Sequence, residues 1–371
     1  GVTGNTEIGI YKSLATISSG NDLLNGGRVP VSNTARLANP DLKWEKTNQF
    51  DIGFNLNLFR NRLNFDISYY YKLTTDLLLE RPVPHTTGFT SVMDNIGKVA
   101  NQGLDFMVNT VNIDTKDFGW SSTLNFNYNK NEIKKLGEND EDILTGPWFI
   151  SGNLVILRKG ESLGSFWGYK REGIWGEDEA EEAKAAGAGV GQPKRSKDRE
   201  ILGKGLPDVT GSFINNFRYK NFDLTVDLQF VLGVDVYQQF LHSTEDRFGI
   251  ANALSSVLSE GWTPANTNTM IPALYSQNSQ PDSHWVANGS YLRANLIQLG
   301  YTFEPSVLKA LHLGSLRAYF SVNNAFCITS KDFKGYDPEG TSWNTDQWGQ
   351  NIMFFQYPKP RTYTLGVNVS F

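Results

Sequence analysis

The sequence predicts an all-β fold, an antiparallel transmembrane β-barrel. Three observations predict it: the strands alternate apolar and polar residues, they pair into hairpins with short turns, and the connections between hairpins are long and polar. Aromatic residues make up 13% of the 371 residues and hydrophobic residues only 39%, and the mean hydropathy is −0.37. A soluble domain is typically about 45–50% apolar, whereas each barrel strand needs only one apolar face.

Other classes of protein fit the composition less well. The sequence contains no run of about 18 apolar residues, so it has no transmembrane helix, and a closed barrel is the remaining way across a bilayer. A net charge of −5 and a pI near 5.5 argue against a nucleic-acid partner. The single Cys327 cannot form an internal disulfide, which leaves the redox compartment open. Since the chain begins at Gly1 without a signal-peptide pattern, we expect it to be part of a longer protein.

The first hairpin shows the alternation most clearly. In 50–58 the apolar face carries Phe50, Ile52, Phe54, Leu56 and Leu58. After a turn at 60–62, the residues of 63–72 alternate in the same way. Three more hairpins and a final strand follow: 104–109 with 120–128, 209–219 with 222–232, 291–303 with 315–325, and 363–371. The pattern predicts nine strands.

The connections divide into two kinds. Short ones lie within hairpins, at 60–62, 114–118, 220–221 and 304–314, and long polar ones lie between hairpins, at about 74–101, 130–208, 233–290 and 326–360. Outer-membrane barrels have short periplasmic turns and long extracellular loops, so we expect a periplasmic C-terminus. Residues 1–49 are predicted to be an extracellular loop and strand region, and 50–371 the barrel strands. A soluble antiparallel sandwich is the alternative, but it gives no reason for every second connection to be long.

Aromatic residues near the expected strand ends suit the two membrane interfaces. They are Trp44, Phe59, Tyr71, Trp120, Tyr128, Tyr219 and Tyr301. Packing on a neighbouring domain is the alternative interpretation. The opposite strand faces are rich in Asn, Asp, Thr and Gln, and would line a lumen. Because nine is an odd number of strands, we expect further strands before Gly1.

A series of short strings from residue 39 to the end carries a resemblance to a known family. They include Asn39-Pro40-Asp41-Leu42-Lys43-Trp44, Asn95-Ile96-Gly97-Lys98-Val99, Asp198-Arg199-Glu200-Ile201-Leu202-Gly203, Lys334-Gly335-Tyr336-Asp337-Pro338-Glu339 and Tyr357-Pro358-Lys359-Pro360-Arg361. In this order they resemble the SusC/RagA family of TonB-dependent transporters from Bacteroidetes. The ending at Phe371 also resembles the signal by which outer-membrane barrels are recognised for assembly.

The resemblance implies the C-terminal part of a barrel of about 22 strands with a plugged lumen. It further implies a SusD-like lipoprotein at the extracellular mouth, contact with the TonB complex through an upstream segment, and dimers of transporter–lid pairs. Members import glycans, or less often peptides. Many relatives carry an Asp-rich stretch resembling a calcium loop before Asp198, but 189–197 lacks clustered carboxylates here. We therefore predict no metal and no cofactor.

Aromatic residues in the long connections are the candidates for contact with substrate or partner, because sugars stack their apolar faces on aromatic rings. The candidates are Trp148, Phe149, Trp167, Tyr169, Trp175, Trp262, Tyr275, Trp285, Trp343 and Trp348. Two other interpretations stay open: loops need small cores of their own, and a lid protein needs an aromatic interface. The charge run at 177–184 predicts a short exposed helix.

No catalytic motif is present, and the four histidines are widely separated, so the protein is not expected to be an enzyme. The leading hypothesis is TonB-dependent glycan import across the bacterial outer membrane, with lipid around the barrel and no nucleic-acid partner. A peptide importer of the same family, a passive porin and a soluble β carbohydrate-binding module are the alternatives.

Overall fold

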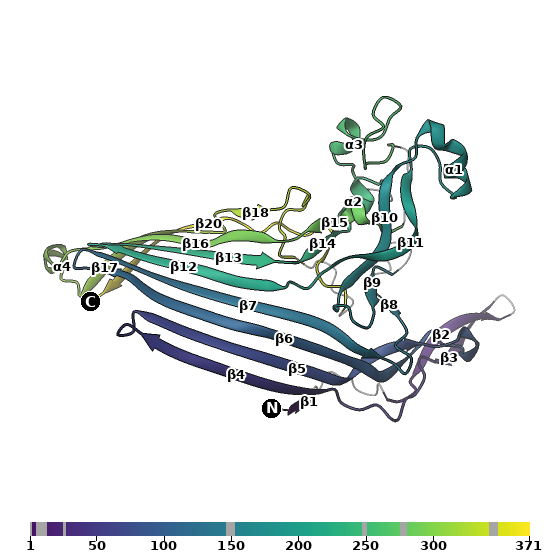
Figure 1. Ribbon diagram of the computed structural model, residues 1–371, viewed down its shortest axis with the longest axis horizontal. Coiled ribbons are helices and arrows are strands. Elements are labelled where there is room, and N and C mark those ends of the chain that lie inside the picture. Colours follow the sequence, from purple (N-terminus) through teal and green to yellow (C-terminus); the bar gives the residue numbers. More distant parts are fainter. Residues whose placement is uncertain are drawn as a thin grey trace.

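A computed structural model describes residues 2–4, 13–24, 27–145, 153–246, 251–274, 280–340 and 348–371. One long, curved antiparallel sheet, the wall, dominates the fold (Figure 1). In spatial order its strands are β1 (Val2–Gly4), β4 (Lys46–Leu58), β5 (Leu63–Pro82), β6 (Ser91–Asp114), β7 (Phe118–Leu136), β12 (Val209–Tyr219), β13 (Phe222–Leu232), β16 (Tyr291–Thr302), β17 (Ser315–Asn323) and β20 (Thr362–Ser370). The short β18 (Cys327–Thr329) also pairs with β16. Apart from β1 and β18, these are the nine predicted strands, each beside its neighbour in sequence.

The register of the wall places apolar residues opposite apolar residues from one strand to the next. One such row is Phe54, Ile67, Phe106, Phe126, Gly211, Phe230 and Leu292. Many side chains of this face are exposed, including Phe54 at 70% and Leu365 at 80%. A soluble protein rarely exposes so large a continuous apolar surface, whereas lipid is the solvent that such a face requires.

The opposite face of the wall carries hydrogen-bonded polar pairs. Asn125 donates to Ser212 at 3.0 Å, and Thr225 donates to Asn216 at 2.9 Å. Arg317 bonds Asp223 through Nε at 3.1 Å across β16, above Gly300. Cross-strand pairs of this kind stabilise a sheet locally. They occupy the face that the sequence predicts to line the lumen.

The short turns agree with the sequence prediction. They are 59–62, 115–117, 220–221 and 303–314, the last containing α4 (Pro305–Leu311). Phe59, Arg60, Asn61 and Lys220 have positive φ angles, which such tight reversals require. Figure 1 shows α4 and the C-terminus together at one end of the wall, with the longer connections at the other.

The predicted long loop at 74–101 is wrong. Strand β5 continues to Pro82 and β6 begins at Ser91, so only 83–90, with η1 (His85–Thr87), connects them. The strands β4 to β7 contain 13, 20, 24 and 19 residues, more than the roughly 9–11 that a tilted strand needs to cross a bilayer. Alternation weakens around Thr75 and Leu77 because the register shifts there, but main-chain pairing continues. For the same reason Tyr71 and Tyr128 lie within strands rather than at their ends.

The other three long connections lie close to where the sequence places them, although β7 continues to Leu136 and the first of them begins at 137 rather than 130, and all three are folded. They contain a four-stranded sheet of β8 (Ile143–Thr145), β9 (Val155–Leu157), β10 (Ser165–Ile174) and β11 (Pro193–Lys204), and a three-stranded sheet of β14 (Asp235–Gln238), β15 (Val286–Asn288) and β19 (Ile352–Met353). Short helices complete them: η2 (Glu177–Glu179), α1 (Ala180–Ala185), α2 (Phe240–Thr244), α3 (Ser256–Ser259) and η3 (Ser283–Trp285). The helix predicted at 177–184 is thus confirmed as η2 and α1. We call the described parts of 137–208, 233–290 and 330–353 the loop unit.

A separate hairpin of β2 (Ile17–Leu24) and β3 (Gly27–Thr34) lies between β1 and β4 in the sequence. The first wall strand after it, β4, begins at Lys46, four residues before the boundary that the sequence suggests. Among the helices of the described residues, none is long and apolar enough to cross a membrane.

Candidate functional site

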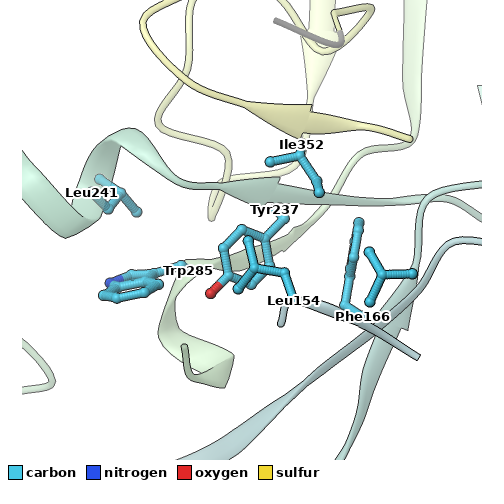
Figure 2. Packing of buried hydrophobic residues seen from close by; sticks show 7 residues of the cluster. Leu154, Phe166, Tyr237, Leu241, Trp285 and Ile352 are labelled. Carbon is cyan, nitrogen blue, oxygen red and sulfur yellow. The ribbon is translucent and has the colours of Figure 1, made fainter. Parts of the chain in front are cut away.

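The loop unit has a core of its own, built from three connections far apart in sequence (Figure 2). Its fully buried members are Leu154, Val155, Phe166, Tyr237, Leu241, Trp285 and Ile352. The Trp285 ring meets Tyr237 edge to face at a centroid distance of 6.0 Å and His242 at 5.5 Å. Aromatic packing of this kind stabilises beyond the area it buries. The three connections therefore fold as one body rather than as independent loops.

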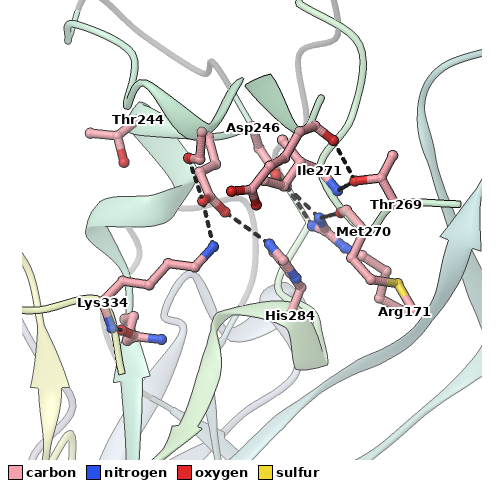
Figure 3. A network of polar contacts seen from close by, with 12 residues as sticks. Arg171, Thr244, Asp246, Thr269, Met270, Ile271, His284 and Lys334 are labelled. Carbon is pink, nitrogen blue, oxygen red and sulfur yellow. Dashed lines mark hydrogen bonds and ion pairs between the residues drawn. The ribbon is translucent and has the colours of Figure 1, made fainter. Parts of the chain in front are cut away.

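A buried ion-pair network also joins the connections (Figure 3). Arg171 of β10 donates from Nη2 to Asp246 at 2.6 Å and to Asp282 at 2.7 Å, and from Nη1 to the Met270 carbonyl at 2.9 Å. Arg195 of β11 donates to the same Asp282 oxygen at 3.0 Å. Although burial by itself would raise the pKa of Asp282, the two guanidinium groups lower it. The Asp282 carboxylate therefore stays ionised inside the protein.

A second ion-pair group ties the connection 233–290 to 326–360. Glu245 accepts from His284 Nε2 at 2.8 Å and from Lys334 Nζ at 2.6 Å. Burial tends to raise the pKa of Glu245, but these two hydrogen bonds outweigh burial and lower the pKa to about 2. His284 lies two residues after Asp282, whose carboxylate accepts from the His284 backbone N–H at 3.0 Å. The two polar groups are thus adjacent and make one network.

Most of the tryptophans that the sequence singles out support the loop unit from inside. Trp285 is fully buried, and Trp262 packs with Ile174 and Ala273 in a second small core. Trp175 is buried beneath Lys194, whose Nζ lies 4.6 Å from its ring centroid. Trp348 packs against the main core and also against a cluster where the wall strands meet the loop unit, formed by Leu79, Val99, Ile133, Leu136, Ile143 and Leu157. For these four rings the structure favours the interpretation that the aromatic residues of the long connections form cores within those connections.

Trp167 and Tyr169 are, like Trp348, only partly buried, but they are not among the residues that pack against the cores. They lie two residues apart on β10, so their side chains share one face of the strand. The Arg158 guanidinium lies 4.9 Å from the Trp167 ring, and that of Arg199 lies 5.0 Å from the Tyr169 ring. Partly open rings next to cations can offer both stacking and hydrogen bonding to a polar ligand. The remaining candidates Trp148, Phe149, Tyr275 and Trp343 lie outside the described residues.

Two polar hollows open near this region. One of about 370 Å³ lies at the outer edge of the loop unit and is lined by residues including Glu172, Lys194 and Thr269. The other, of about 800 Å³, lies over the ends of β5, β6 and β7 and is lined by residues including Arg81, Lys98 and Asp142. Within the described ranges, no three His, Cys, Asp or Glu side chains are grouped closely enough to hold a metal ion.

Sequence reasoning missed the ion-pair network. Asp246 and Asp282 are 75 and 111 positions away from Arg171, so no local pattern connects them. Of the residues in the network, only Lys334 was marked by the sequence, as the first residue of one of the strings that resemble the SusC/RagA family. Pairing of distant charges is a property of the folded connections.

A wall with one apolar and one polar face, short turns at one end and a folded unit at the other defines an outer-membrane β-barrel segment. Residues 11–325 match the family described as TonB dependent receptor-like, beta-barrel. The chain belongs to this family of TonB-dependent outer-membrane transporters and is of the SusC/RagA type, as the resemblance implied.

Individual relatives agree with this assignment. TonB-dependent receptor P3 of Formosa agariphila is 34% identical over all of this chain and 38% of its own length. TonB-dependent receptor SusC of Bacteroides thetaiotaomicron is 31% identical over 90% of the chain and 32% of its own length. The RagAB peptide importer in its closed-closed state superposes over the whole chain and 40% of its own, with a TM-score of 0.78 and 28% identity. The chain thus spans about two fifths or less of these relatives.

Proposed function

We propose that the chain supplies the C-terminal wall and the extracellular loop unit of a transporter that imports oligosaccharides across the outer membrane, driven by TonB. The observation that carries the proposal is the fusion of three long connections into one rigid body at the end of the wall opposite the short turns. In this assignment the short turns and the C-terminus are periplasmic. A SusD-like lipoprotein covers the loop unit, and dimers of transporter–lid pairs form.

Three features support an oligosaccharide. Trp167 and Tyr169 present partly open rings on one strand face, the hollows beside the loop unit are polar, and the network around Arg171 holds β10 rigid. Rigid aromatic surfaces bind sugars with little loss of conformational entropy. The family is one of transporters, so a catalytic role is not part of the proposal.

A peptide is the second candidate, because the RagAB neighbour is described as a peptide importer. Cations next to the rings, such as Arg158 and Arg199, would suit peptide carboxylates equally well. The TonB requirement is common to both candidates, whereas a porin would lack it.

The test uses the full-length transporter with its lid lipoprotein. We expect uptake of a fluorescent oligosaccharide pool to stop in cells without TonB, and Trp167→Ala to weaken binding about tenfold, the loss of one stacking contact of about 1.4 kcal/mol. Trp120→Phe, on the lipid-facing side of β7, is the matched control and should bind normally. Uptake that continues without TonB would contradict the proposal. Selective binding of a tryptic peptide pool would show that the substrate is a peptide and not a glycan.

A further inference from the structure

The lipid-facing side of the wall contains one polar patch, formed by Asn112, Ser122 and Asn215. Trp120 Nε1 and Ser122 Oγ both donate to Asn215 Oδ1, at 3.1 and 2.7 Å, and Asn112 Nδ2 donates to Ser122 Oγ at 2.8 Å. Asn215 alternates with Phe213 and Phe217 and pairs with Val226 of β13, so its side chain lies on the apolar face. Polar groups on a lipid-facing surface are costly and call for a partner.

The patch has hydrogen-bond donors left over. Two donors already occupy Asn215 Oδ1, which fixes the orientation of the amide, and no hydrogen bond between described residues uses Asn215 Nδ2. Asn215 is only 8% exposed, so the Trp120 ring, stacked on Phe217 at 5.7 Å, and its other neighbours leave a narrow opening. The group that fits beside this amide nitrogen is an acceptor such as an ester carbonyl or a phosphate oxygen.

Cations lie directly below the patch, on three adjoining turns. Arg62 Nη2 donates to the Asn112 carbonyl at 3.4 Å, and the Lys220 backbone N–H donates to the Asp117 carbonyl at 2.7 Å, so these turns are neighbours. The Lys220 ammonium lies 5.7 Å from the centroid of the outward-facing Tyr219 ring, on the lipid side. The turns carry Arg60, Arg62, Lys116 and Lys220 against Asp114 and Asp117. Asp114 is already paired with Arg218, so the rim has an excess of positive charge.

The height between Asn215 and Lys220 is slightly larger than the depth of the lipid head-group layer. Asn215 is four residues from Tyr219, roughly 13 Å along a strand, or about 10 Å in height for a strand tilted by about 40°. The interfacial layer of a bilayer is about 5–8 Å thick on each side. With Lys220 at the outer edge of this layer, beside the phosphate, Asn215 lies about 2–5 Å inside the edge of the hydrocarbon, within reach of the ester groups.

We propose that this patch and the adjoining Lys116 and Lys220 bind one anionic glycerophospholipid of the periplasmic leaflet. The cations hold the phosphate, Asn215 donates to an ester carbonyl, and the acyl chains follow the apolar face beside Phe213 and Val226. The inference rests on the proposed function only for the sidedness of the turns. Bound lipid would anchor the β6–β7 and β12–β13 hairpins in the membrane.

Native mass spectrometry of the full-length transporter in detergent, titrated with phosphatidylglycerol, tests the proposal. We expect retained lipid on the wild type, and about tenfold weaker retention for Lys220→Gln, which corresponds to the loss of one charge-assisted contact of about 1.4 kcal/mol. The double variant Lys220→Gln with Asn215→Leu should lose the lipid. The matched controls are Lys309→Gln, on a turn farther along the rim, and Asn216→Ala, the neighbour of Asn215 on the lumen face; both should bind as the wild type does.

Equal lipid retention by the wild type and Lys220→Gln would overturn the proposal. The comparison is direct because this single surface change leaves the fold intact. Preferential binding of lipopolysaccharide at the same residues would overturn the leaflet assignment. Loss of a transporter dimer in the double variant, with lipid retention unchanged, would show that a second copy covers the patch. The titration needs neither substrate, TonB nor lid, so a protein that retains lipid but imports nothing refutes only the proposed function.

Discussion

The wall and the loop unit are built for different solvents. In the wall, large apolar side chains such as Phe54 and Leu365 point outward and are exposed, while the polar pairs lie on the opposite face. In the loop unit the arrangement is reversed, with Trp285 and Phe166 fully buried. The wall depends on main-chain pairing and lipid, whereas the loop unit has the core of a water-soluble protein. A change at one should therefore leave the other largely intact.

The largest expected effect is on the loop unit alone. Arg171→Met would leave Asp246 and Asp282 buried without their main cation, which costs roughly 3–5 kcal/mol. Hydrogen exchange of the full-length protein should show faster exchange in β10, α2 and η3 with β12 and β13 unchanged. Arg199→Met, which removes a cation from the partly buried Tyr169 ring, is the control. Loss of protection across the wall strands as well would contradict the independence of the two regions.

A smaller effect is expected in the wall alone. A Cβ on Gly300 would lie 2.3 Å from Arg317 Nη2 and 2.6 Å from both Asp223 carboxylate oxygens, so Gly300→Val must displace this ion pair. We expect a loss of about 1–2 kcal/mol, seen as a lower temperature of barrel unfolding on semi-native gels. Gly20→Ala, where nothing lies within 4 Å of the added Cβ, is the control. An unchanged unfolding temperature of the barrel, together with a disturbed loop unit, would refute the inference that Gly300 and its ion pair stabilise the wall alone.

The smallest effect is a response of the loop unit to pH. Burial lowers the pKa of His242 from 6.5 to about 4, so folding keeps this histidine neutral. The stabilisation is complete above pH 6.5 and is lost as the pH falls through about 4, at a cost on the order of 1 kcal/mol. Exchange in α2 should rise over this range, and His242→Gln should remove that rise. The lowered pKa of Glu245 acts mostly below this range, between pH 4.5 and about 2, so the rise in exchange above pH 4.5 reports His242 alone.

The wall was predictable because its signals are local. Alternation in β12 and β13 and the turn at Lys220-Asn221 follow from the residues themselves, so those strand bounds agree closely with the sequence prediction. The prediction of a loop at 74–101 was wrong because it relied on alternation. The ends of β5 and β6 lose their alternation where the register shifts, although their backbones remain paired.

The sequence by itself therefore determined the antiparallel wall, its turns and its family, because period-two patterning and short turns need no knowledge of distant residues. Only the tertiary structure decided the role of the loop residues. Trp285 and Trp167 are the same residue type, and both lie in long connections. The ring of Trp285 nevertheless fills a core, whereas the ring of Trp167 is partly open. The partners of Arg171 likewise depend on where three separate connections meet. Burial and charge pairing across such distances arise from the fold, so the sequence pattern alone could not assign them.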